Sequence, residues 1–298
     1  MNDIDRALRV LRDGGLVAIP TETVYGLAAD ASNAAAVQRI FDIKGRPVVH
    51  PLIVHLGSPE QLSDWAATIP PSAALLADAC WPGPLTLLVP RATHVLDVVT
   101  GGRSTVGVRV PAHPLTLEML ARFGGGLAAP SANRFGRVSP TTADHVRADL
   151  GDDVDFVLDG GACPIGVEST IVDCTVDPPQ VLRPGGIATE DIASLLTTVL
   201  GASVGPSRAP GMLASHYAPR CHVMLVDTSQ DAQRLAAGRP GIEILDDRDL
   251  VHYAHTLYSR LRDADDRDVD TVIAVMPPAV GLGHAIRDRL AKAASQPR

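Results

Sequence analysis

The sequence predicts an α/β protein in which a domain with a mixed, mostly covered sheet precedes a small βαβαβα unit. Along nearly the whole chain, short apolar runs alternate with segments whose apolar residues recur at helical spacing. Residues 201–220 interrupt this alternation because Gly, Pro, Ser and Ala dominate them, so we predict a linker there. The length of 298 residues is also more than one ordinary domain needs.

The composition limits the class of protein. Hydrophobic residues make up 46% of the chain and aromatics only 3%, so a substantial core must be built from Val, Leu, Ile and Ala. A formal net charge of -8 argues against broad, unspecific binding of nucleic acid, although a local basic cleft remains compatible with it. The first residues lack the apolar segment of a signal peptide and no run of about 18 apolar residues occurs, so we expect a cytoplasmic protein.

Helix boundaries in the first domain are marked by capping residues. Asn33 and Gly45 are typical of the start and the end of a helix, and Ser58 with Gln61 forms a capping-box pattern. The helices are predicted at 3–13, 33–45, 58–67, 113–126 and 143–150. The strands are predicted at 16–19, 51–56, 85–90, 104–111, 127–130, 154–159, 169–174 and 180–185.

A second alternation follows the linker. It predicts three parallel strands joined by right-handed helical crossovers. The strands are expected at 221–227, 241–245 and 269–277, and the helices at 229–238, 249–265 and 283–294. We therefore divide the chain into a domain at 1–205, a linker at 206–220 and a C-terminal domain at 221–298.

Four cysteines, Cys80, Cys163, Cys174 and Cys221, are scattered along the chain. None forms a C-x-x-C pair, so zinc-ribbon and thioredoxin chemistry have no support. We expect reduced, buried thiols.

Polar side chains gather beside the predicted strands of the first domain. Behind the first strand, "PTETVYGL" at 20–27 places two hydroxyls, a carboxylate and a phenol in a loop, which either caps the strand or carries function. In the strand at 104–111, three valines alternate with Thr105, Gly107 and Arg109, so the second face suits either an anion-binding cleft or solvent. His55 lies in another strand, where such a residue is more often structural than ligand-binding.

Cations and small polar residues form two further groups. Lys44, Arg46 and His50 follow a helix end and suit phosphate groups, or they only complement the helix C-terminus. A small-residue strand precedes Ser131 and Asn133. Polar residues recur later in the same domain at Ser139, Thr141, Glu168, Ser169, Thr170 and Arg183. No Walker A, G-x-G-x-x-G, H-E-x-x-H or G-x-S-x-G motif occurs, and no nucleophile with a paired base is apparent, so we expect no covalent catalysis.

The order of these motifs carries a resemblance. "PTETVYGLAAD", "KGRP" followed by "HPLIVHL", "WPGPLTLLV", "TVGVRVP", "APSAN" with "SP" after it, "ESTIVD" and "RPG" together resemble the Sua5/YrdC family of threonylcarbamoyl-AMP synthases, over about residues 5–205. The linker motif "APGMLASHYAP" resembles the segment that joins this domain to the C-terminal Sua5 domain, although the C-terminal region here is shorter than usual.

The resemblance implies a YrdC-like twisted mixed sheet with a concave cleft, followed by a small Rossmann-like domain. It implies an L-threonylcarbamoyladenylate synthase that joins L-threonine, bicarbonate and ATP and releases pyrophosphate. A partner transferase would use the product to modify N6 of adenosine 37 in tRNA. Mg²⁺ is implied with ATP, whereas membrane association and stable binding of nucleic acid are not expected.

Residue roles follow from the same resemblance. Thr23 would bind threonine in a pocket shaped by Glu22 and Tyr25. Threonine would be held by Thr23, His55, Arg109, Ala129 and Ser169, and ATP by Lys44, Arg46, His50, Thr105, Ser131, Ser139, Arg183 and Tyr217. Lys44 and Arg46 are predicted to be catalytic because they would stabilise the leaving pyrophosphate. Tyr217, in the linker, would act as part of a lid.

Two other readings remain at this point. The domain can be an RNA-binding module without catalysis, but RNA binding alone does not require Thr23, Arg109 and Ser169 together. It can also be a carbamoyl-transfer domain like those of hydrogenase-maturation proteins, but the zinc-finger and acylphosphatase modules that accompany such domains are missing from this sequence.

Overall fold

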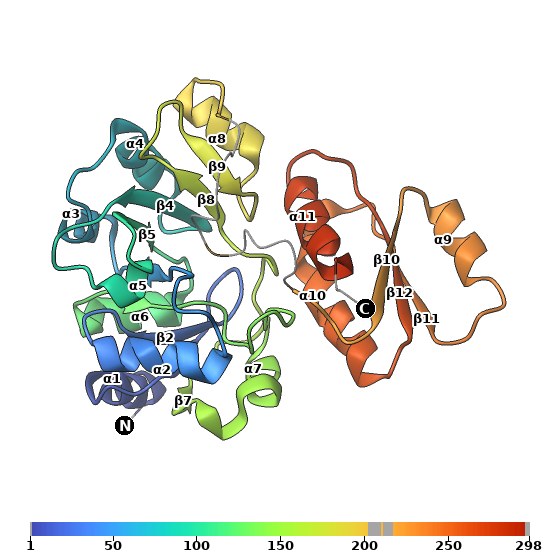
Figure 1. Cartoon of the computed structure of the whole chain (residues 1–298), viewed down its shortest axis with the longest axis horizontal. Helices are drawn as coiled ribbons and strands as arrows, with labels where there is room; N and C mark the ends of the chain where they lie inside the picture. The colour runs from blue at the N-terminus through green and yellow to red at the C-terminus, as the bar shows by residue number, and fades with distance from the viewer. Residues whose placement is uncertain (1, 202–209, 211–216, 296–298) are drawn as a thin grey trace.

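The computed structural model describes residues 2–201, 210 and 217–295, and it has the predicted α/β class. A large unit built on a nine-stranded sheet is followed by a smaller unit built on a three-stranded sheet (Figure 1). Of the predicted linker at 206–220, only residues 210 and 217–220 are described. Among the described residues, none of the helices combines the length and apolar character needed to cross a membrane.

The large sheet is mixed, with the strand order β7-β1-β2-β6-β3-β5-β4-β8-β9. β3 pairs with β5 and β4 with β8 in parallel, whereas β4 and β5 are antiparallel. The strands are β1 (Val17–Ile19), β2 (Gly26–Asp30), β3 (Ile53–His55), β4 (Leu85–Pro90), β5 (Thr105–Arg109), β6 (Leu127–Ala128), β7 (Phe156–Val157), β8 (Thr170–Asp173) and β9 (Gln180–Arg183).

Helices cover both faces of this sheet, and their ends follow the predicted caps. Asn33 accepts a hydrogen bond from the Ala36 amide at the start of α2, and Gly45 ends that helix with a left-handed φ of 64°. The helices are α1 (Asp3–Arg12), α2 (Ala34–Lys44), α3 (Leu62–Trp65), α4 (Pro71–Cys80), α5 (Asp97–Thr100), α6 (Pro114–Phe123), α7 (Ala143–Leu150) and α8 (Thr189–Leu196), with short 3₁₀ turns at Pro59–Gln61 and Gly151–Asp153.

Four of these elements were not predicted from the sequence. In α4, alanines and leucines are distributed around the helix, so the apolar pattern has little periodicity to detect. α5 is a single turn. β2 consists of small residues that become a strand only by pairing with β1 and β6. α8 follows β9 without a capping side chain. The predicted helix at 58–67 is instead a 3₁₀ turn with the expected Ser58–Gln61 capping box, followed by α3.

An apolar layer of helices packs on each face of the large sheet. On one face, α2, α4 and α7 pack on the central strands in the main core, which contains Val106, Val108 and Val110 as expected. On the other face, α1 and α6 pack on β1, β2 and β6. The polar residues described below lie over β3 and β5, beside this second layer.

The small unit has three parallel strands in the order β10-β12-β11, as predicted. Figure 1 shows α10 and α11 on the side of its sheet toward the large unit and α9 on the far side. The strands are β10 (His222–Val226), β11 (Ile242–Leu245) and β12 (Thr271–Val275), and the helices are α9 (Ser229–Ala236), α10 (Leu250–Asp266) and α11 (Gly283–Ala294).

The two units share a buried cluster. Val24, Val138 and Val167 of the large unit pack in the same cluster as Leu257 and Leu261 of α10. The interface is therefore an extension of a hydrophobic core rather than a loose contact. All four cysteines are free, and Cys163, Cys174 and Cys221 are buried.

Candidate functional site

A cavity lined by charged, polar and small side chains lies over β3 and β5. Three arginines contribute to its wall, and small residues leave the backbone accessible. The lining residues are Thr21, Thr23, Val24, Tyr25, Gly26, Arg46, Ile53, His55, Arg109, Ala129, Pro130, Ser131, Glu168, Ser169, Arg183, Pro210 and Tyr217.

The floor is set by the parallel pairing of β3 with β5. The register places His55 opposite Arg109, so both side chains point to the same face. Burial, reinforced by the charge of Arg109, lowers the pKa of His55 from 6.5 to about 3. His55 is therefore neutral near pH 7, and its Nδ1 lies 3.3 Å from the carbonyl of Ile53.

Arg109 is held by three protein groups. Its Nη2 lies 2.7 Å from Glu22 Oε1, its Nη1 donates to Thr23 Oγ1 at 3.0 Å, and its Nε donates to the Gly83 carbonyl at 3.2 Å. Each terminal nitrogen has a second N–H, although Nη2 itself is buried. Burial raises the pKa of Glu22, but Arg109 and the Ala112 amide outweigh burial and hold that pKa below its ordinary value, so the pair is ionic.

The loop behind β1 is a tight hydroxyl-stabilised turn. Thr21 Oγ1 donates to the Val24 carbonyl at 2.6 Å and accepts from the amides of Thr23 and Val24 at 3.1 and 3.2 Å. This turn directs Thr23 toward Arg109. Tyr25 also lines the cavity, while its hydroxyl donates to the Gly161 carbonyl at 2.8 Å.

The opposite wall is built around Arg183 at the end of β9. Its Nη2 donates to the carbonyl and the hydroxyl of Ser169 at 2.9 and 3.0 Å, and its Nη1 donates to the Pro210 carbonyl at 3.3 Å. The Ser169 hydroxyl also lies 2.8 Å from Thr86 Oγ1. Arg183 thereby ties β9 to the residue that precedes β8.

Arg46 completes the cationic part of the wall. Its Nη2 donates to the Pro51 carbonyl at 2.9 Å, and its guanidinium lies 5.8 Å from the ring centroid of Phe135. Burial lowers the pKa of Arg46 to about 10, which still leaves it charged near pH 7. Arg46, Arg109 and Arg183 together make the cavity a site for anions.

Lys44 does not line the cavity, in contrast to the predicted phosphate contact. Its Nζ is buried beneath the loop after β6 and donates to the carbonyls of Ser131 and Asn133 at 2.6 and 2.5 Å. Burial lowers its pKa well below the ordinary value. In the same loop, Asn133 Nδ2 donates to the carbonyls of Arg134 and Arg137 at 2.9 and 2.8 Å. Lys44 therefore braces the loop that presents Ser131.

Three other residues assigned to ATP lie outside the lining. The His50 ring is 5.9 Å from that of Phe135, and Thr105 begins β5 opposite Pro90. Ser139 is fully buried and donates to Glu168 Oε1 at 2.7 Å. All the residues assigned to threonine do line the cavity, as do Arg46, Ser131, Arg183 and Tyr217.

Glu168 also lines the cavity, and its carboxylate has no role predicted from the sequence. Besides Ser139, it accepts from Tyr258 of α10 at 2.9 Å and from Arg289 Nε of α11 at 2.8 Å. Burial raises its pKa, but Arg289, Arg183 and Ser139 outweigh that effect and bring the pKa to about 2. No sequence signal points to Tyr258 or Arg289, since both are ordinary helix residues far along the chain.

Tyr217 lies at the junction of the linker and the small unit. Its ring centroid is 5.7 Å from that of Tyr258, and the Arg289 guanidinium is 5.2 Å from its centroid. It is buried, and burial raises its pKa to about 12. The other predicted lid residues, Met212, Leu213 and His216, lie outside the described residues.

Both units of the chain are similar to known proteins. Residues 9–185 match the family model for Sua5, YciO and YrdC, described as telomere recombination, and residues 187–295 match one described as threonylcarbamoyl-AMP synthase, C-terminal domain. The threonylcarbamoyl-AMP synthase of Pyrococcus abyssi is 42% identical over 95% of this chain and 91% of its own length. That of Bacillus subtilis is 39% identical over 98% and 92%.

A solved structure agrees with the whole fold. The crystal structure of Pyrococcus abyssi Sua5 complexed with L-threonine superposes with a TM-score of 0.92 at 40% identity, covering 98% of this chain and 94% of that one. The similarity therefore extends over both units.

Proposed function

The chain belongs to the Sua5/YrdC family of threonylcarbamoyl-AMP synthases, and on that premise we propose how its cavity makes the product. The enzyme is a transferase that forms an adenylate, threonylcarbamoyl-AMP. The proposed substrates are L-threonine, bicarbonate and ATP. The unprotonated amine of threonine forms a carbamate with bicarbonate and water is released. A carbamate oxygen then attacks the α-phosphorus of ATP, and pyrophosphate leaves.

Threonine is proposed to bind over β3 and β5. The free N–H groups of Arg109 bind its carboxylate as a fork, while Glu22 and Thr23 fix the orientation of the guanidinium. Because His55 is neutral, it accepts or donates a hydrogen bond without repelling the threonine ammonium. The Ala129 backbone and Ser169 complete this end of the cavity.

ATP is proposed to occupy the end lined by Arg46, Ser131 and Arg183, with Tyr217 closing one side. Arg46 is assigned to the leaving pyrophosphate because it is a buried cation without a carboxylate partner among the ion pairs of the described residues. Lys44 is now assigned a positioning role, since its amino group holds the Ser131 loop. Ser139 is proposed to act through its hydrogen bond to Glu168. His50 and Thr105 are proposed to support ATP binding from outside the lining of the cavity.

Mg²⁺ is proposed to arrive with ATP as part of the substrate. The described residues contain no group of three His, Cys, Asp or Glu side chains placed to hold a metal. Glu22 and Glu168, the nearest carboxylates, already accept from arginines. Phosphate oxygens and water are ligands that suit Mg²⁺, so the ion is proposed to be coordinated mainly by the triphosphate.

The arrangement explains how the reaction proceeds without a nucleophilic side chain. Two substrate anions are held beside each other, and buried arginines neutralise the charge that develops on the phosphates. The reactive product is then proposed to pass to a tRNA threonylcarbamoyltransferase, which modifies adenosine 37 of tRNA. Tyr217 is proposed to limit the access of water to the mixed anhydride.

One observation carries this proposal: Arg46, Arg109 and Arg183 line a single cavity with Thr23, Ser131 and Ser169. The test is to incubate the protein with ATP, Mg²⁺, L-threonine and bicarbonate and to measure pyrophosphate. Release that depends on both threonine and bicarbonate is expected. Equal release without threonine would refute the assignment, and RNA binding without any pyrophosphate would favour the RNA-module reading.

A further inference from the structure

The wall of the cavity that contains Glu168 is held by side chains from the small unit. Tyr258 and Arg289, on α10 and α11, occupy both oxygens of the Glu168 carboxylate: Tyr258 lies 3.1 Å from Oε1 and 2.9 Å from Oε2, and Arg289 Nε lies 2.8 Å from Oε2. Arg289 Nη1 also donates to the Pro184 carbonyl at 2.8 Å. Tyr258 and Arg289 are both fully or almost fully buried.

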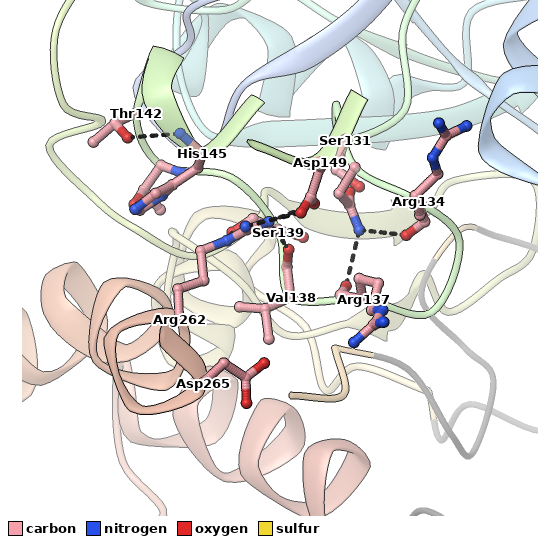
Figure 2. Close-up of polar contacts among 12 residues, drawn as sticks. Ser131, Arg134, Arg137, Val138, Ser139, Thr142, His145, Asp149, Arg262 and Asp265 are labelled. Carbon is pink, nitrogen blue, oxygen red and sulfur yellow. Dashed lines mark hydrogen bonds and ion pairs between the residues drawn. The ribbon is translucent and has the colours of Figure 1, made fainter. Parts of the chain in front are cut away.

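A second contact from α10 reaches the same wall one helical turn later. Arg262 inserts between α7 and the loop before it, where its Nη1 and Nη2 lie 3.1 and 2.7 Å from the two carboxylate oxygens of Asp149 (Figure 2). Its guanidinium also donates to the carbonyls of Val138 and Ser139. Since the Ser139 hydroxyl bonds Glu168, Arg262 supports Glu168 through Ser139.

Glu168 in turn is linked to the nucleotide end of the cavity. Its neighbour Ser169 presents a carbonyl and a hydroxyl that fix Arg183. The amide of Gly186 donates to the Glu168 carbonyl at 3.0 Å, which holds the following turn against the same strand. A displacement of Glu168 is therefore transmitted through the peptide bond to Ser169 and through the hydrogen bonds of Ser169 to Arg183.

We propose that Tyr258, Arg262 and Arg289 are positioning residues for the synthesis reaction, through which the small unit sets the geometry of Glu168, Ser169 and Arg183. The inference rests on the proposed use of this cavity. It gives the small unit a defined part in the reaction.

Each proposed positioning residue has a matched control on its own helix. Tyr253 is a fully buried tyrosine of α10 whose hydroxyl bonds Leu245 and Val275 of the small unit. Arg260 of α10 donates to the Ile244 carbonyl at 2.7 Å, and Arg287 of α11 donates to the Pro277 carbonyl at 2.8 Å. These three contacts stay within the small unit, so their loss tests damage to its fold without touching Glu168.

The experiment compares Tyr258→Phe, Arg262→Gln and Arg289→Met with Tyr253→Phe, Arg260→Gln and Arg287→Met in the full chain. Calorimetry with ATP and pyrophosphate release are measured on folded protein. We expect Arg289→Met and Arg262→Gln to weaken ATP binding at least about tenfold and to lower kcat at least about tenfold. Tyr258→Phe, which removes one oxygen, should lower both about threefold or more, and the controls should stay within about twofold.

A pH profile separates positioning from stability. The groups that face the Glu168 carboxylate are Ser139, Arg183, Tyr217, Tyr258 and Arg289. Without Arg289, only Arg183 and Ser139 offset the burial of the carboxylate, so the pKa of Glu168 should rise and Arg289→Met should gain an acidic limb in kcat that wild type lacks. Arg289→Lys retains the charge and should keep the wild-type profile.

The outcomes are separable. If wild type releases no threonine-dependent pyrophosphate, the proposed function fails, and the ATP affinities still decide the inference. If the variants lose thermal stability to the same extent as their controls but keep wild-type ATP affinity, kcat and pH profile, the small unit has only a structural role and the inference is overturned.

Discussion

Replacing Arg109 by lysine tests how the cavity distinguishes its two substrates. Arg109 contacts Glu22, Thr23 and the Gly83 carbonyl with different nitrogens, and only 4% of its surface is exposed. A lysine ammonium can keep the contact to Glu22 but cannot reproduce the planar fork that would also bind the threonine carboxylate. Arg109→Lys should therefore weaken threonine much more than ATP.

The magnitude follows from the contacts that are lost. A hydrogen bond to a charged group contributes about 1.5–3 kcal/mol, so losing one arm of the fork to threonine should cost about 1–3 kcal/mol of binding. This corresponds to a rise in the threonine Kd of about 5-fold to 150-fold. The lost bonds to Thr23 and Gly83 should also lower the free energy of unfolding by about 2–4 kcal/mol, while ATP affinity should change by no more than about threefold.

Isothermal titration with threonine and, separately, with Mg²⁺–ATP measures both affinities, and urea denaturation measures stability. Arg46→Lys is the matched control, because Arg46 is a buried arginine that lines the same cavity on the proposed nucleotide side. It should weaken ATP and leave threonine nearly unchanged. An unchanged threonine affinity in Arg109→Lys, or an equal loss for both ligands, would refute the assignment.

Three further predictions concern single residues. Arg46→Ala should lower kcat by at least about tenfold, because the charge of Arg46 stabilises the transition state most when pyrophosphate leaves. Lys44→Met should chiefly raise the KM for ATP, because it loosens the Ser131 loop. Steady-state kinetics that gave the two variants the same pattern would contradict this division. The pKa of His55 is about 3 in the folded protein and ordinarily 6.5, so the unfolded chain takes up the proton first as the pH falls. The free energy of unfolding should therefore decrease as the pH decreases from 6.5 toward 3. His55 should contribute a slope that approaches about 1.4 kcal/mol per pH unit. Urea unfolding at several pH values should show a shallower slope for His55→Asn, and an identical slope would count against a neutral His55. A Cβ at Gly185 would lie 2.3 Å from the Glu168 carbonyl oxygen. Gly185→Ala should therefore lower the free energy of unfolding by about 1–3 kcal/mol, which thermal unfolding can measure. A wild-type Tm would show that the turn relaxes freely.

Strand alternation allowed part of the site to be predicted from sequence. Because successive side chains of a strand point to opposite faces, burying Val106, Val108 and Val110 forces Arg109 to the other face. The same period places His55 beside it once β3 and β5 pair. Most of the fold was predictable for the same reason: periodic apolar patterns and capping residues are local properties.

Long-range contacts could not be predicted in this way. Lys44 and Arg46 are two residues apart and both cationic, yet one is turned under a loop and the other lines the cavity. That difference depends on the carbonyls of Ser131 and Asn133, which lie far along the sequence. The partners of Glu168 on α10 and α11 depend in the same way on how two units pack.

The position of Arg289 in the chain has a consequence for how the enzyme comes into being. Glu168, in the first unit, is translated long before Arg289 of α11, the residue that holds its carboxylate. During synthesis on the ribosome, the large sheet can therefore form while the wall of its cavity is still incomplete. If α11 sets the geometry of Glu168 as proposed, a chain that ends before Arg289 should consume little ATP and release little reactive anhydride.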